Sequence, residues 1–157
     1  MVIYSFIRNL ISKTLIILLT IYLVVFIPIL WNYYPLIIVS GSMEPILKVG
    51  GILYYHPKEI KDFKENEILV FRTKKHIVSH RVIDVNKDGF ITKGDANKKI
   101  DSSVVLKTQI LGEGTNFSIP LLGYYVDFIY NHKYILLFIC LTLFIDLHRK
   151  GMIKKNE

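Results

Sequence analysis

The sequence predicts a small, mostly β domain that an N-terminal helix anchors in a membrane, with a second apolar segment near the C-terminus. Three observations support this fold class. Residues 14–31 carry no charged side chain and are almost entirely apolar. Short runs rich in β-branched and aromatic residues, separated by polar turns, fill the middle of the chain. A shorter apolar stretch follows at 134–145.

The first apolar stretch has the length of a membrane span. Its 18 residues lie between Lys13 and Asn32, and as a helix they would extend roughly 27 Å, close to the ~30 Å hydrocarbon core of a bilayer. A cleaved signal peptide is the alternative, but it requires a shorter apolar core and a cleavage site of small residues. We therefore expect 14–31 to be an uncleaved anchor. The basic residues before it predict that 1–13 are cytoplasmic and that the following domain lies outside.

The second apolar stretch permits two interpretations. Its 12 residues between Lys133 and Asp146 are too few to cross a bilayer alone. Residues 128–147 together could span if His132 and Lys133 reach toward an interface. The basic residues of 148–157 favour a cytoplasmic C-terminal tail. We expect a second transmembrane helix at 128–147, with an interfacial helix as the alternative.

Between these ends, residues 32–127 are predicted to form the extracytoplasmic β domain. The runs have the alternation and composition of strands, and the turn at 86–90 is typical of a hairpin. The expected strands are 51–56, 67–72, 76–85, 89–93 and 103–111.

Charge and cysteine content restrict the function classes. The chain of 157 residues has 20 Lys and Arg against 13 Asp and Glu, a net charge of +7. These charges are spread out and lack the clustering of Arg with aromatic residues that marks a nucleic-acid surface, so an anionic lipid surface is the expected attraction. The single cysteine, Cys140, excludes a disulfide framework and a cysteine-based zinc site.

Two serines and a histidine are candidates for chemistry. Ser40 and Ser42 lie in the turn SGSMEP directly after the anchor, where serines ordinarily form turns and caps. In a strand over 77–85, His80 shares a largely apolar face with Val78 and Val82. Such a histidine is either a core residue bonded to a carbonyl group or a desolvated general base.

Two acids complete a possible catalytic set. Asp95 and Asp101 lie in the polar segment TKGDANKKIDSS, whose lysines would also suit an ordinary surface turn. A serine, a histidine and an acid together supply the nucleophile, the base and the group that orients the base. The chain order differs from that of α/β-hydrolases, and there is no Gly-x-Ser-x-Gly elbow, so a different scaffold is expected.

Four sequence blocks carry a family resemblance: SGSMEP at 40–45, SHRVI at 79–83, TKGDAN at 92–97 with Asp101 after it, and IPLLGYYV at 119–126. With the N-terminal anchor, they cover nearly the whole chain in one order. The sequence resembles the type I signal peptidases, in the endoplasmic-reticulum and archaeal branch that also occurs in some endospore-forming bacteria. The resemblance implies a small signal-peptidase-like β domain.

The resemblance also implies roles for individual residues. Ser42 corresponds to the nucleophile, and His80 stands where bacterial members have a lysine base. Asp101 corresponds to the acid usually assigned to the triad, with Asp95 in support, and the sequence leaves open which of them orients His80. Ser40 and Met43 fall at positions for the oxyanion hole and substrate binding.

The implied function is that of a membrane-bound serine endopeptidase that removes signal peptides from secretory preproteins through an acyl-enzyme. Small side chains are expected before the cut, and no metal or organic cofactor is implied.

The enzyme would lie in the cell membrane, or in the endoplasmic-reticulum membrane of a eukaryote, with its catalytic domain on the extracytoplasmic or lumenal face. Its expected partners are membrane-embedded preproteins and the bilayer, with secretion-complex subunits as further candidates and no nucleic acid. Two alternatives are a non-catalytic accessory β domain of a secretion complex and a peptidase dedicated to one substrate.

Overall fold

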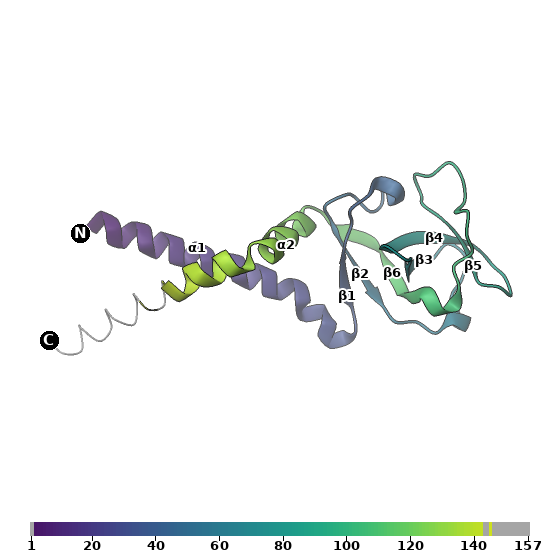
Figure 1. Cartoon of the computed structure of the whole chain (residues 1–157), viewed down its shortest axis with the longest axis horizontal. Helices are drawn as coiled ribbons and strands as arrows, with labels where there is room; N and C mark the ends of the chain where they lie inside the picture. The colour runs from purple at the N-terminus through teal and green to yellow at the C-terminus, as the bar shows by residue number, and fades with distance from the viewer. Residues whose placement is uncertain (1, 143–144, 146–157) are drawn as a thin grey trace. The chain divides into compact units, whose positions relative to one another are not determined.

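The computed structural model describes residues 2–142 and 145, and the chain divides into two compact units (Figure 1). One unit is Phe26–Tyr125 and contains a six-stranded sheet. The other contains helix α1 (Val2–Phe26) and the helices after Val126. The predicted combination of an N-terminal apolar helix with a mostly β domain is therefore confirmed.

Helix α1 provides the candidate membrane anchor. Phe6–Trp31 is 26 residues long and apolar enough to cross a membrane, and within the described residues no second helix has this length and composition. The α-helical part ends at Phe26 because Pro28 has no backbone N–H to donate. A short 3₁₀ helix (Ile27–Trp31) follows and ends at Asn32, whose left-handed backbone (φ 62°) turns the chain toward the sheet.

Within the described residues, the C-terminal apolar helix is shorter than predicted. Helix α2 (Leu122–Asn131) is followed by an apolar helix at Lys133–Thr142, which at about 1.5 Å per residue extends only half the hydrocarbon thickness. The described residues thus give no support to the second transmembrane helix expected at 128–147. Residues 143–144 and 146–147 of that prediction lie outside the described part of the chain. The interfacial alternative stays a prediction.

The sheet is antiparallel, in the order β1-β2-β6-β3-β4-β5 (Figure 1). Its strands are β1 (Tyr34–Ile37), β2 (Ile52–His56), β3 (Ile68–Arg72), β4 (Ile77–Val85), β5 (Phe90–Lys93) and β6 (Ile110–Ile119). The strands expected within 51–56, 67–72, 76–85 and 89–93 are all present. The prediction of a strand at 103–111 is wrong. This segment contains one β-bridge, from Val105 to Phe90, and a 3₁₀ helix (Lys107–Gln109) before β6 begins.

Close packing explains why β6 contains glycines that resemble turn signals. A Cβ atom at Gly112 would lie 2.1 Å from the carbonyl oxygen of His56 on β2, and one at Gly114 would lie 3.0 Å from the side chain of Ile68. Both glycines therefore allow neighbouring strands to approach β6 closely. Strand β1 was missed because it contains Pro35, which only an edge strand accommodates easily.

The sheet is buried on both faces, and β3 shows this most clearly. Ile68 and Val70 pack in one apolar cluster, whereas Leu69 and Phe71 pack in the other, because successive side chains of a strand point to opposite faces. We call these sides the Ile68 face and the Leu69 face. The Leu69 face also carries Phe63, Val82, Phe90 and Val105.

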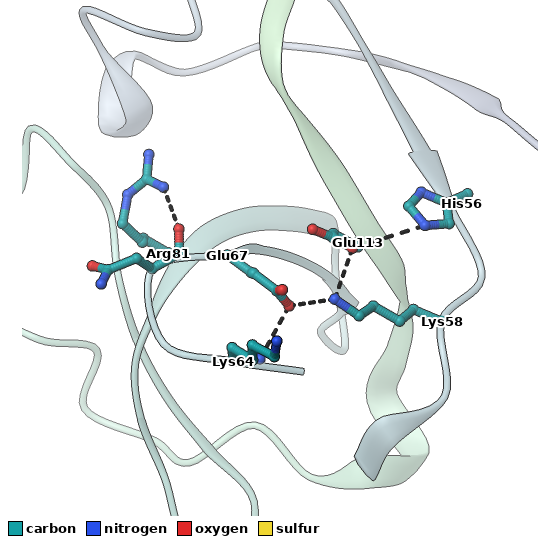
Figure 2. Close-up of polar contacts among 7 residues, drawn as sticks. His56, Lys58, Lys64, Glu67, Arg81 and Glu113 are labelled. Atoms are coloured by element: carbon teal, nitrogen blue, oxygen red, sulfur yellow. Dashed lines mark hydrogen bonds and ion pairs between the residues drawn. The ribbon is translucent and has the colours of Figure 1, made fainter. Parts of the chain in front are cut away.

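An ion network lies on the Leu69 face, where the ends of β2 and β3 meet β6 (Figure 2). The Lys58 ammonium group lies between two carboxylates, 2.6 Å from Glu67 and 2.9 Å from Glu113. Glu67 also accepts the backbone N–H of Lys64 at 3.0 Å, and His56 lies 3.8 Å from Glu113. The three charged side chains of the ion pairs are 18–22% exposed. The network links the segment after β2 and the residue before β3 to β6 through largely buried charges.

Candidate active site

His80 lies on the Leu69 face, as the alternation of β4 predicts. It is directly opposite Leu69 on β3 and is 9% exposed. The rings of His80 and Phe71 meet edge to face, with 6.4 Å between their centroids. The imidazole therefore lies in a largely apolar setting on this face.

The two ring nitrogens of His80 bond to Ser42 and Asp101. Nε2 lies 3.1 Å from Ser42 Oγ, and Nδ1 lies 2.6 Å from Asp101 Oδ2. Because a carboxylate can only accept, Nδ1 carries the proton in this arrangement and the lone pair of Nε2 faces the serine hydroxyl. Residues from three separate segments therefore form one hydrogen-bonded chain, Ser42–His80–Asp101.

The backbone around Ser42 is held by the core and by a neighbouring turn. Ser42 lies in a 3₁₀ helix (Gly41–Met43), and the side chain of Met43 is 1% exposed in the core. The Ala96 N–H donates to the carbonyl oxygen of Ser42 at 2.9 Å. A Cβ atom at Gly94 would lie 2.6 Å from that oxygen, so the turn can approach Ser42 only because position 94 is glycine.

Asp95 lies on the other side of the sheet, with Arg81. Since Arg81 follows His80 on β4, its side chain leaves the opposite face. Arg81 donates to both carboxylate oxygens of Asp95, from Nε at 2.8 Å and from a terminal nitrogen at 2.6 Å. These hydrogen bonds raise the pKa of Arg81 above its ordinary value, although burial lowers it. Of the two candidate acids, the structure brings Asp101 to His80 and Asp95 to Arg81.

A cavity of about 360 Å³ opens beside the Ser42–His80 pair. Ser40 is exposed, and its Oγ lies 3.3 Å from Ser42 Oγ. Met43 belongs to the core of the Ile68 face and also lines the cavity. The remaining lining comes from 36–39, 76–79 and Asn97. Most of the cavity wall is therefore formed by largely apolar residues at the end of β1 and the start of β4.

Sequence reasoning missed Thr92, which is fully buried and donates from Oγ1 to Asp101 Oδ2 at 2.6 Å. A signal for it was present. Thr92 lies two residues after Phe90 in the predicted strand 89–93, so it shares the face that Phe90 buries, and a polar residue there requires a partner. Among the residues that the structure describes, no group of three or more His, Cys, Asp or Glu side chains is arranged to hold a metal ion.

Curated proteins that are similar to this chain include a bacterial and a human relative. The first, "Signal peptidase I W" of Bacillus subtilis (strain 168), is 34% identical over 101 residues, which are 59% of this chain and 52% of that protein. The match thus spans about half the length of the bacterial relative. The second, "Putative signal peptidase complex catalytic subunit SEC11B" of Homo sapiens, is 30% identical over 133 residues, which are 74% of this chain and 79% of that protein.

No model of a known protein family matches the chain. The human relative is nevertheless similar over most of both sequences, and the names of both relatives contain the words signal peptidase. Together with the N-terminal apolar helix, these similarities show that the chain belongs to the signal peptidase I family.

Proposed function

We propose that this protein is a membrane-anchored serine endopeptidase that cleaves signal peptides from secretory preproteins. The observation that carries the proposal is the Ser42–His80–Asp101 chain, whose serine end faces a cavity. A serine next to a histidine, which is in turn held by an acid, is the arrangement that acyl transfer requires. The family membership supplies the substrate class.

In the proposed mechanism, Ser42 Oγ attacks the carbonyl carbon of the scissile bond while His80 Nε2 takes its proton. Asp101 holds Nδ1–H and stabilises the imidazolium ion that forms. The backbone N–H groups near Ser42, with the hydroxyl of Ser40, are the candidate donors to the oxyanion. His80 then protonates the leaving amine, and a water molecule activated by the same histidine releases the acyl group from Ser42.

The cavity suits an extended peptide. Strand β5 pairs with β4 only from Arg81 onward, so the other edge of 77–80 has no strand partner in the described sheet. Residues 38–39, just after β1, also line the cavity. An extended substrate segment can add to such an edge through its backbone, and a narrow apolar site favours small side chains before the cut by excluding larger ones.

The anchor explains how enzyme and substrate meet. Ser42 follows Trp31, the last residue of the apolar segment, by 11 positions, so the chain connecting them spans at most roughly 36 Å. A preprotein held in the bilayer by its own apolar segment would offer its scissile bond near the same surface. We place the β domain on the extracytoplasmic or lumenal side because basic residues precede the anchor. Secretion-complex subunits are candidate partners.

The test is cleavage of a preprotein with a standard signal sequence by the full chain in detergent. Ser42→Ala removes the attacking oxygen, and we expect the kcat of the variant to fall by about 10⁶-fold. Ser103→Ala is the matched control, because Ser103 is exposed and lies outside the hydrogen-bonded chain. Circular dichroism and melting temperature of all three proteins establish equal folding.

The outcomes separate the alternatives. Cleavage by the wild type and by Ser103→Ala, but not by Ser42→Ala, supports the proposal. Equal cleavage by Ser42→Ala means that Ser42 is not the nucleophile. If the folded wild type cleaves none of a panel of preproteins but cleaves one dedicated protein, the enzyme is a specialised peptidase. If the wild type cleaves nothing, and the Ser42→Ala variant restores function to cells that lack this protein, the domain is an accessory subunit.

A further inference from the structure

Thr92 is a fully buried polar residue next to the candidate active site. It lies on β5, directly opposite Val82 of β4, and its exposed fraction is 0%. A buried hydroxyl group without a hydrogen-bond partner destabilises a protein, so its partner is informative. That partner is Asp101 Oδ2, the same carboxylate oxygen that accepts the hydrogen bond from His80 Nδ1.

Two donors converge on Asp101 Oδ2. Thr92 Oγ1 lies 2.6 Å from it, and His80 Nδ1 lies at the same distance. A carboxylate offers only lone pairs, so the hydroxyl of Thr92 must be the donor. Donor–acceptor distances this short are typical of hydrogen bonds to a charged oxygen.

The backbone strengthens this contact. Asp101 lies in the loop after β5, outside any strand. Its N–H donates to the carbonyl oxygen of Thr92 at 2.8 Å. Thr92 therefore holds both the main chain and the side chain of Asp101, and it does so from a strand paired with the one that carries His80.

We propose that Thr92 is a positioning residue: its hydroxyl group fixes the orientation of the Asp101 carboxylate, which in turn holds His80 toward Ser42. This inference rests on the proposed function. Thr92 is not among the residues that line the cavity, and its hydroxyl group donates to Asp101, so it would act through Asp101. A packing role is the competing explanation, because the methyl group of Thr92 is also buried.

Two substitutions separate the hydroxyl from the methyl group. Thr92→Val keeps the shape and removes the donor, whereas Thr92→Ser keeps the donor and removes the methyl group. We expect Thr92→Val to lower kcat by about 10- to 100-fold, the effect of one hydrogen bond to a charged group, with KM unchanged. Thr92→Ser should stay within about 3-fold of wild type. If the methyl group mattered instead, Thr92→Ser would be the worse variant.

A double-mutant cycle tests whether Thr92 acts through Asp101. In an Asp101→Asn background, Thr92→Val should have almost no further effect on kcat, because the group that it orients has lost its function. An equal fall in both backgrounds would overturn the assignment, as would a wild-type kcat for Thr92→Val. Should Thr92→Val fail to fold, Thr92→Ser and Thr92→Ala form a second pair that differs only in the hydroxyl group.

A spectroscopic measurement distinguishes failure of this inference from failure of the proposed function. In ¹⁵N-labelled protein, the low-field proton signal of a histidine Nδ1–H bonded to a carboxylate reports the His80–Asp101 bond without any substrate. We expect Thr92→Val to shift or broaden this signal and Thr92→Ser to retain it. An unchanged signal in Thr92→Val would refute the inference, even if the preprotein assay showed no cleavage by the wild type.

Discussion

Two polar clusters share the Leu69 face of the sheet: one is an ion network, and the other is a hydrogen-bonded chain that ends at a cavity. Glu113 on β6 and His80 on β4 are the direct cross-strand neighbours of Leu69, one on each side. On the Glu113 side, Lys58 closes an ion network between two carboxylates (Figure 2). On the His80 side, the hydrogen-bonded chain runs from Asp101 to Ser42 and ends at the cavity.

The difference shows how one face can carry both stability and chemistry. In the ion network, the charged groups pair with one another. Removing one member therefore leaves a largely buried charge without its partner. In the Ser42–His80–Asp101 chain, Ser42 lines the cavity, where a substrate could reach it, and in the proposed mechanism His80 takes its proton while Asp101 holds the imidazole. We therefore expect substitutions in the chain to change rate with little effect on stability, and substitutions in the ion network to do the reverse.

The largest contrast should be between the two histidines of this face. His80→Ala removes the base, and kcat should fall by about 10⁴-fold or more. His56→Ala removes the histidine beside Glu113, and kcat should stay within about twofold of wild type, because His56 pairs with Glu113, which lies on the other side of Leu69 from His80. Preprotein cleavage by the two variants measures the contrast; comparable losses in both would contradict it.

Substitutions of the two aspartates should show a similar contrast, one in rate and the other in stability. Asp101→Asn keeps the shape but favours the wrong tautomer of His80, so kcat should fall by about 10²- to 10⁴-fold at nearly unchanged stability. Asp95→Asn weakens a bidentate pair with Arg81 whose side chains are only 16–17% exposed, and unfolding in urea should become easier by about 2–4 kcal/mol. Its kcat should fall far less than that of Asp101→Asn. The reverse ranking of rates would assign the catalytic acid to Asp95.

In the ion network, Lys58→Met should lower the free energy of unfolding by about 1–3 kcal/mol and leave kcat unchanged, since Glu67 and Glu113 lose their shared cation. Lys61→Met is the matched control. Lys61 pairs with Glu59 at 2.7 Å, but both side chains are more than 70% exposed, so its removal should change stability by less than about 0.5 kcal/mol. Urea unfolding of both variants provides the measurement, and equal stabilities would refute the proposed role of burial.

The smallest effect concerns pH. Burial alone raises the pKa of Glu67, but hydrogen bonds from Lys58 and from the Lys64 N–H outweigh it, and the pKa lies below the ordinary value of 4.5. A carboxyl group with a lowered pKa in the folded state stabilises the protein above its unfolded-state pKa. That contribution is lost as pH falls through the folded-state pKa. Between pH 6 and pH 3, the wild type should therefore lose more stability than Glu67→Gln, as measured by thermal melts; parallel losses would contradict the shift.

The sequence predicted the strands that follow simple rules. The β-branched and aromatic runs that became β2–β5 are visible by inspection, and the alternation along β4 placed His80 on an apolar face. The strand expected at 103–111 ends where β6 has only begun, and β6 continues through Gly112 and Gly114, which allow His56 and Ile68 to approach closely. Such a close approach depends on neighbouring strands, so no local pattern reveals it.

The choice between the two acids could have been argued further from the same alternation. His80 and Arg81 are consecutive in β4 and therefore face opposite sides. An acid that pairs with Arg81 is thus on the wrong side for His80. What the sequence did not show was which acid the loop after β5 carries to each face, because that depends on the path of residues 94–101 past Ser42 and Thr92.

The central claim is that Ser42 and His80 act as one unit, and a double-mutant cycle on kcat tests it most directly. Ser42→Ala, His80→Ala and the double variant are compared with the wild type on one preprotein, with equal folding verified by circular dichroism. If the residues form one nucleophile–base pair, the double variant should be no slower than the slower single variant. If the two losses multiply instead, Ser42 and His80 act independently and the proposed mechanism is wrong.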